Sequence, residues 1–90
     1  MRISKSHLRT ILNKLKDLYP LPLEAEDYAG LAAAVGDEMT LDGHLLYLQE
    51  KGFIHTSMNY HVAQRAWRIN SQETRISADG LDYLEDERSM

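Results

Sequence analysis

The sequence predicts a small α+β domain in which three helices precede a β-hairpin and a fourth helix closes the chain. Apolar residues recur at three- and four-residue steps over the first half of the chain, as they do along one face of a helix. After Gly52 the pattern changes to two runs rich in β-branched and aromatic residues, separated by a polar stretch, which is typical of a hairpin. At 90 residues the chain is expected to form one domain, spanning 1–90.

The first helix is expected over residues 6–19. Either Ser4 or Ser6 supplies its N-cap oxygen, and Pro20 ends it, because the residue before a proline avoids the helical region. Its apolar stripe consists of Leu8, Ile11, Leu12, Leu15, Leu18 and Tyr19.

Two more helices are expected before the hairpin. One covers residues 23–35 and ends at Gly36. The next takes Thr40 as its N-cap, runs to Lys51 and has Gly52 as its C-terminal glycine. The residues of this third helix that face inward are Leu41, Leu45 and Leu48.

The hairpin is expected from strands at residues 53–58 and 66–69, joined by residues 59–65. A short extended piece at 74–76 then leads to Ser77, the N-cap of a last amphipathic helix. Because side chains alternate along a strand, Arg65, Trp67 and Ile69 share one face, and Trp67 is expected to pack into the core rather than to stack on a base.

Several classes of protein do not fit the composition. Without cysteine there is no disulfide or thiolate metal site, which fits the cytoplasm, and the four histidines lack the spacing of metal ligands. The longest apolar stretch, residues 31–35, is far short of the roughly 20 residues of a membrane span, and the polar start of the chain resembles no targeting signal. No phosphate-binding loop or nucleophile motif is present, so neither an enzyme nor a cofactor is expected.

Charge is distributed unevenly along a chain of net charge −4. Residues 1–16 carry five basic residues and no acid, and residues 51–76 carry four basic residues against one acid. Residues 17–50 hold eight acids and no basic residue, and residues 77–90 are also acidic. The basic first helix, with Lys5, Arg9 and Lys16, either contacts phosphate or pairs with the acidic helices of the same molecule.

Two segments carry a resemblance to a known family. His44-Leu-Leu-Tyr-Leu-Gln-Glu-Lys-Gly-Phe-Ile54 looks like the end of a recognition helix entering a wing, and Arg75-Ile-Ser-Ala-Asp-Gly-Leu-Asp-Tyr-Leu-Glu85 looks like the passage into a closing helix. Over nearly its whole length the chain resembles the winged-helix superfamily, and within it the short YjcQ-like proteins of bacteria and phages. The resemblance implies a winged-helix fold and, by default, binding of double-stranded DNA as a transcriptional regulator, although many members bind proteins or RNA.

The family's usual mode places the outer face of the third helix in the major groove and the wing against phosphate. Carried onto this chain, it gives two sets of nucleic-acid-binding candidates. The phosphate contacts are expected from Lys51, Arg65 and Arg68, and the contacts to base edges from Thr40, Tyr47 and Gln49. The outer face of the third helix departs from the pattern, because it holds Asp42 and Glu50 and neither Lys nor Arg.

A second hypothesis explains the same helix face. Gly43, Leu46 and Tyr47 form either an apolar patch for a protein partner, which would make the protein an adaptor, or an ordinary surface. DNA binding is the leading hypothesis and protein binding the alternative, with a homodimer compatible with both.

Overall fold

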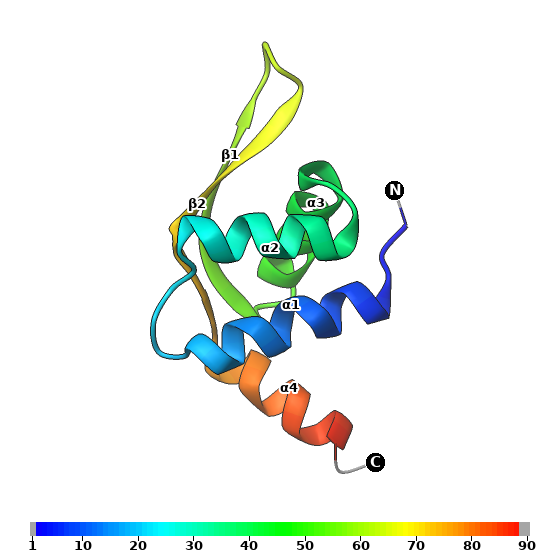
Figure 1. Cartoon of the computed structure of the whole chain (residues 1–90), viewed down its shortest axis with the longest axis vertical. Helices are drawn as coiled ribbons and strands as arrows, with labels where there is room; N and C mark the ends of the chain where they lie inside the picture. Colours follow the sequence, from blue (N-terminus) through cyan, green and yellow to red (C-terminus); the bar gives the residue numbers. More distant parts are fainter. Residues whose placement is uncertain (1, 89–90) are drawn as a thin grey trace.

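In the computed structural model, which describes residues 2–88, four helices and one antiparallel hairpin follow one another in the expected order (Figure 1). The helices α1 (Lys5–Leu18), α2 (Ala25–Val35) and α3 (Glu38–Glu50) come first. The strands β1 (Ile54–His61) and β2 (Ala66–Ile76) form the hairpin, and α4 (Ala78–Arg88) closes the chain. This is the α+β, winged-helix layout that the sequence predicts.

The helix starts are set by side chains that accept backbone N–H bonds. Of the two candidate serines, Ser4 caps α1, because its hydroxyl accepts from the His7 N–H at 3.2 Å. A capping box at Glu24 makes α2 begin at Ala25, two residues later than predicted.

The predicted cap of α3 is wrong. Asp37 is the N-cap, its carboxylate accepting the Thr40 N–H at 2.7 Å, and Thr40 lies inside the first turn. Gly36, with a φ of 124°, ends α2 in a conformation that suits glycine, so Asp37 follows it directly and starts the next helix.

The core lies between α1 and α3, as the apolar stripes predict. Ile11, Leu12 and Leu15 of α1 are fully buried, and the predicted inward residues of α3 are buried with them. The base of the hairpin completes this core through Ile54 and Ile76.

The start of α4 is tied to the end of α3. The Ser77 N–H donates to the Phe53 carbonyl at 2.9 Å, and the Ser77 hydroxyl donates to the Gly52 carbonyl at 2.6 Å. The same hydroxyl accepts from the Gly80 N–H at 3.0 Å, which confirms Ser77 as the cap of the last helix.

The hairpin is longer than predicted and has two ladders. At its base Ile54 pairs with Ile76 and His55 with Arg75, whereas the outer ladder runs from Ser57 and Asn70 to the tip. Between the two ladders residues 71–74 of β2 lie opposite Thr56 alone, which forms a bulge. The predicted separate piece at 74–76 is therefore the end of β2. We call residues 57–70 the wing.

The bulge is held by side chains and by the chain before α2. The Thr56 and Thr74 hydroxyls lie 2.7 Å apart, and the Leu23 N–H donates to the Thr74 carbonyl at 2.9 Å. The base of the hairpin is thereby fixed to the body.

Beyond the base, the wing projects past α3 along the 44 Å axis of the molecule (Figure 1). Met58 and Ile69, which face each other across the ladder, are its last residues packed against the core. Trp67 lies two pairs further out and is 38% exposed, so the prediction that it packs into the core is wrong. Ile69 does face the core, as the alternation of side chains along the strand predicts, but the helices do not extend far enough along the wing to cover the Trp67 ring.

Within residues 2–88, no helix is both long and apolar enough to span a membrane.

Candidate nucleic-acid interface

The wing is cationic and free of acids. From Lys51 to Gln72 the sequence contains no Asp or Glu, in a chain whose net charge is −4. Arg65 and Arg68, the two arginines of this stretch, are exposed. The fold therefore gathers positive charge on the hairpin that projects past α3 (Figure 1).

Arg65 lies at the tip of the wing. The turn is closed by bonds from the Gln64 N–H to the His61 carbonyl and from the Arg65 N–H to the Val62 carbonyl, each of 3.2 Å. Arg65 has a φ of 49°, in the left-handed region, which is uncommon for a residue other than glycine, asparagine or aspartate. Its side chain makes no ion pair with the described residues.

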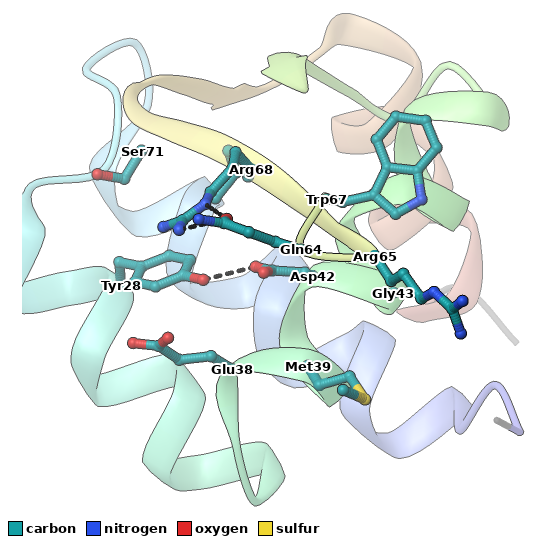
Figure 2. Close-up of a pocket in the computed structure, with 11 residues that line it drawn as sticks. Tyr28, Glu38, Met39, Asp42, Gly43, Gln64, Arg65, Trp67, Arg68 and Ser71 are labelled. Carbon is teal, nitrogen blue, oxygen red and sulfur yellow. Dashed lines mark hydrogen bonds between the residues drawn. The ribbon is translucent and has the colours of Figure 1, made fainter. Parts of the chain in front are cut away.

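Arg68 is held in place by a side chain of the tip. Its Nε and Nη2 atoms donate to the Gln64 Oε1 at 3.0 and 2.6 Å (Figure 2). A guanidinium has five N–H donors, so this fork uses two and leaves three for other acceptors. Gln64 is a positioning residue whose bond to Arg68 the sequence does not predict, because residues four apart across a hairpin turn have no fixed spatial relation.

A cleft of about 610 Å³ separates the wing from α2 and α3 (Figure 2). Its wing side carries Arg65, Trp67 and Arg68. Its helical side carries Tyr28, Glu38, Met39 and Asp42. The two walls thus bear opposite charges.

Tyr28 and Asp42 form the polar floor of this cleft. The Tyr28 hydroxyl donates to the Asp42 Oδ1 at 2.5 Å and joins α2 to α3 (Figure 2). Burial, together with the adjacent carboxylate, raises the pKa of Tyr28 well above its usual range. Burial also raises the pKa of Asp42, with Glu38 adding to the rise, while the Tyr28 bond and the Arg68 charge oppose it.

Tyr28→Phe is expected to raise the pKa of Asp42 further, because it removes the hydrogen bond that favours the ionised carboxylate. A group whose pKa is raised by folding stabilises the fold below its unfolded pKa, and this stability is lost as pH rises through its folded pKa. The variant should therefore lose more stability between acid and neutral pH than the parent protein. A carbon-13 NMR titration of the Asp42 carboxyl measures the pKa.

Tyr47→Phe is the matched control, because Tyr47 lies on the same helix as Asp42 but its hydroxyl makes no bond to that carboxylate. An Asp42 pKa that stays constant or falls in Tyr28→Phe would contradict the assignment of the bond.

The other predicted nucleic-acid residues lie apart from the wing arginines. Thr40 is half-buried in the first turn of α3, and the Gln49 amide donates to the Thr56 carbonyl at 3.3 Å. Tyr47 is half-buried against the core, and the exposed Lys51 places its Nζ 5.7 Å from the centre of the Tyr47 ring. Gln49 thus joins α3 to the hairpin, and Tyr47 packs against the core.

The predicted protein-binding patch is divided by the fold. Gly43 lines the cleft, whereas Leu46 and Tyr47 are half-buried. The exposed apolar residue of α3 is instead Met39, at 75%. Sequence reasoning missed Met39 because it placed the helix start at Thr40.

One lysine of the first helix pairs within the molecule. Lys14 Nζ lies 3.2 Å from the Asp27 Oδ1 of α2. The Glu24 N–H and Lys14 together hold the pKa of Asp27 below its ordinary value. The prediction for the first helix named Lys5, Arg9 and Lys16 and not this lysine, so it stays a prediction.

Comparison with protein-family profiles, with curated proteins and with solved structures gives no match to the chain. Among the described residues, no group of three or more side chains is arranged to hold a metal ion.

Proposed function

We propose that the protein binds double-stranded DNA through its wing and acts as a transcriptional regulator in the cytoplasm, as a binding protein rather than an enzyme. The observation that carries the proposal is the acid-free, arginine-bearing wing projecting from an acidic body. Phosphate contacts are normally made by Arg and Lys, and a β-ribbon fits into or against a groove of the duplex.

Arg65 and Arg68 are the phosphate-binding residues of this proposal. Arg65 is exposed at the tip, and the Gln64 fork restricts Arg68 before DNA arrives, which lowers the entropy lost on binding. Lys51 is exposed where α3 ends and serves as a third, peripheral contact.

The charge of α3 sets the mode of binding. Glu38 and Asp42 face the cleft beside the wing, and a phosphate backbone brought against them would be repelled. Binding is therefore led by the wing and not by insertion of α3. Thr40, Tyr47 and Gln49 have no required contact with bases in this mode.

Fluorescence anisotropy of a labelled mixed-sequence duplex tests the proposal. We expect binding at low salt that weakens steeply as salt rises, because phosphate contacts release counterions. Arg65→Ala with Arg68→Ala should weaken binding by about tenfold or more and reduce the salt slope by about one for each phosphate that is no longer neutralised. Trp67, the one tryptophan of the chain, lies between these arginines, so its emission provides a second, label-free readout.

Lys5→Ala with Lys16→Ala is the matched control, because it removes the same formal charge from α1. If both double variants lose affinity equally, the attraction is to net charge and the wing is not the contact. Absence of binding at low salt would overturn the proposed function itself.

A further inference from the structure

The cleft beside the wing presents unpaired charges of opposite sign. Glu38 is exposed on the helical wall and Arg65 is exposed on the wing wall. Neither makes an ion pair with the residues that the structure describes. The carboxylate of Asp42 between them is already engaged by Tyr28. Glu38 and Arg65 are thus available to a partner, and so are the three donors that Arg68 does not use on Gln64.

Exposed apolar side chains surround these charges. Met39 is 75% exposed and Trp67 is 38% exposed, and both line the cleft. Val62, at the tip of the wing, is 78% exposed. Single exposed apolar residues need no explanation, but a group of them beside one cleft is typical of an interaction surface.

We propose that this surface binds a second copy of the same chain. In a twofold dimer the same patch is used by both subunits, so the patch must be complementary to itself. A patch with an acidic wall and a basic wall meets this condition. The wing tip of each copy lies in the cleft of the other, where Arg65 of one copy pairs with Glu38 of the second copy, twice in each dimer.

The chemistry of the cleft favours this occupant over a uniformly charged one. A polyanion in the cleft would meet Glu38 and Asp42, and a polycation would meet Arg65 and Arg68. A second copy supplies both signs, and the exposed Val62 of its wing tip supplies an apolar side chain for Met39 and Trp67.

Dimer formation also bears on DNA binding, and this one consequence rests on the proposed function. Arg65 cannot pair with Glu38 of a second copy and with phosphate at the same time. The dimer therefore withholds the wing from DNA, and DNA and the second copy compete for the same residue.

Sedimentation equilibrium of the purified protein without DNA tests the dimer. The protein should show a monomer–dimer equilibrium between about 1 and 500 µM. Glu38→Arg and Arg65→Glu, made singly, should each weaken association by about tenfold or more, because each places like charges together twice in a dimer. The double variant exchanges the two charges and should restore association.

Circular dichroism is used to check that each variant is folded. Glu50→Arg, which changes an exposed acid outside the cleft, is the control for overall charge. A protein that stays monomeric over the whole range overturns the proposal. So does a dimer that both single variants leave intact, or one that the double variant fails to restore. Because no DNA is present, these results are independent of whether the protein binds DNA.

Discussion

Gly80→Ala is expected to lower the free energy of unfolding by about 2–3 kcal/mol, because α4 lies against the chain with no room for a methyl group. A Cβ at this position would lie 2.7 Å from Ile76 Cγ1 and even closer to the Phe53 carbonyl oxygen. The carbonyl belongs to the backbone and cannot rotate away. It also accepts the Ser77 N–H, so relief of the clash would strain the cap of α4.

Gly30→Ala is the matched control. Gly30 lies within α2, is exposed, and has open space where the methyl group would be placed. Removing a glycine from a helix interior should stabilise the fold by about 0.5–1 kcal/mol. The midpoints of urea unfolding should therefore move in opposite directions, and a Gly80→Ala midpoint at or above the parent value would show that α4 is not packed in this way.

His44→Ala is expected to cost about 3 kcal/mol of stability, because the imidazole is fully buried and both of its nitrogens are bonded. Nε2 accepts the Ser4 N–H at 2.9 Å, so the ring proton is on Nδ1, which donates to the Thr40 carbonyl at 2.7 Å. Truncation removes the partner of the Ser4 N–H and opens a cavity, while the Thr40 carbonyl keeps its helical bond within α3. The ring also contacts His7 edge-on, at 5.3 Å between centroids.

His55→Ala serves as its control, since His55 is exposed on β1. Its urea midpoint should change little, whereas that of His44→Ala should fall clearly. In His44→Ala the amide protons of the first turn of α1 should also exchange faster, because Ser4 is the cap of that helix. Equal stability of the two variants would refute the role given to His44.

The helices and their inward faces were predictable because periodicity depends on local sequence alone. The first four residues of the α1 stripe and the inward leucines of α3 are buried as predicted, whereas Leu18 is half-buried and Tyr19, just past the end of α1, is 46% exposed. The errors concern features set by distant contacts. The cap at Asp37 depends on how α2 ends, and the exposure of Trp67 depends on how far the body reaches along the wing.

The candidate site was predictable only in part for the same reason. Arg65 and Arg68 stand in an acid-free stretch that the sequence displays directly. The helical wall of the cleft cannot be recognised in the sequence, because Tyr28 and Asp42 come from different helices and meet the wing only in the folded chain. Glu38 and Met39 could not be recognised as cleft residues, because the sequence placed the start of α3 after them, at Thr40.

The bulge at residues 71–74 separates the part of the hairpin that packs into the core from the part that projects into solvent. The base ladder completes the hydrophobic core, and the wing beyond it carries Arg65 and Arg68. Because a bulge bends its strand and alters the local twist, its length sets the direction of the wing. An insertion or deletion at residues 71–73, which leaves the buried Thr74 in place, would change the direction of the wing without disturbing Ile54 or Ile76. Reach and stability can thus evolve as independent properties of one short chain.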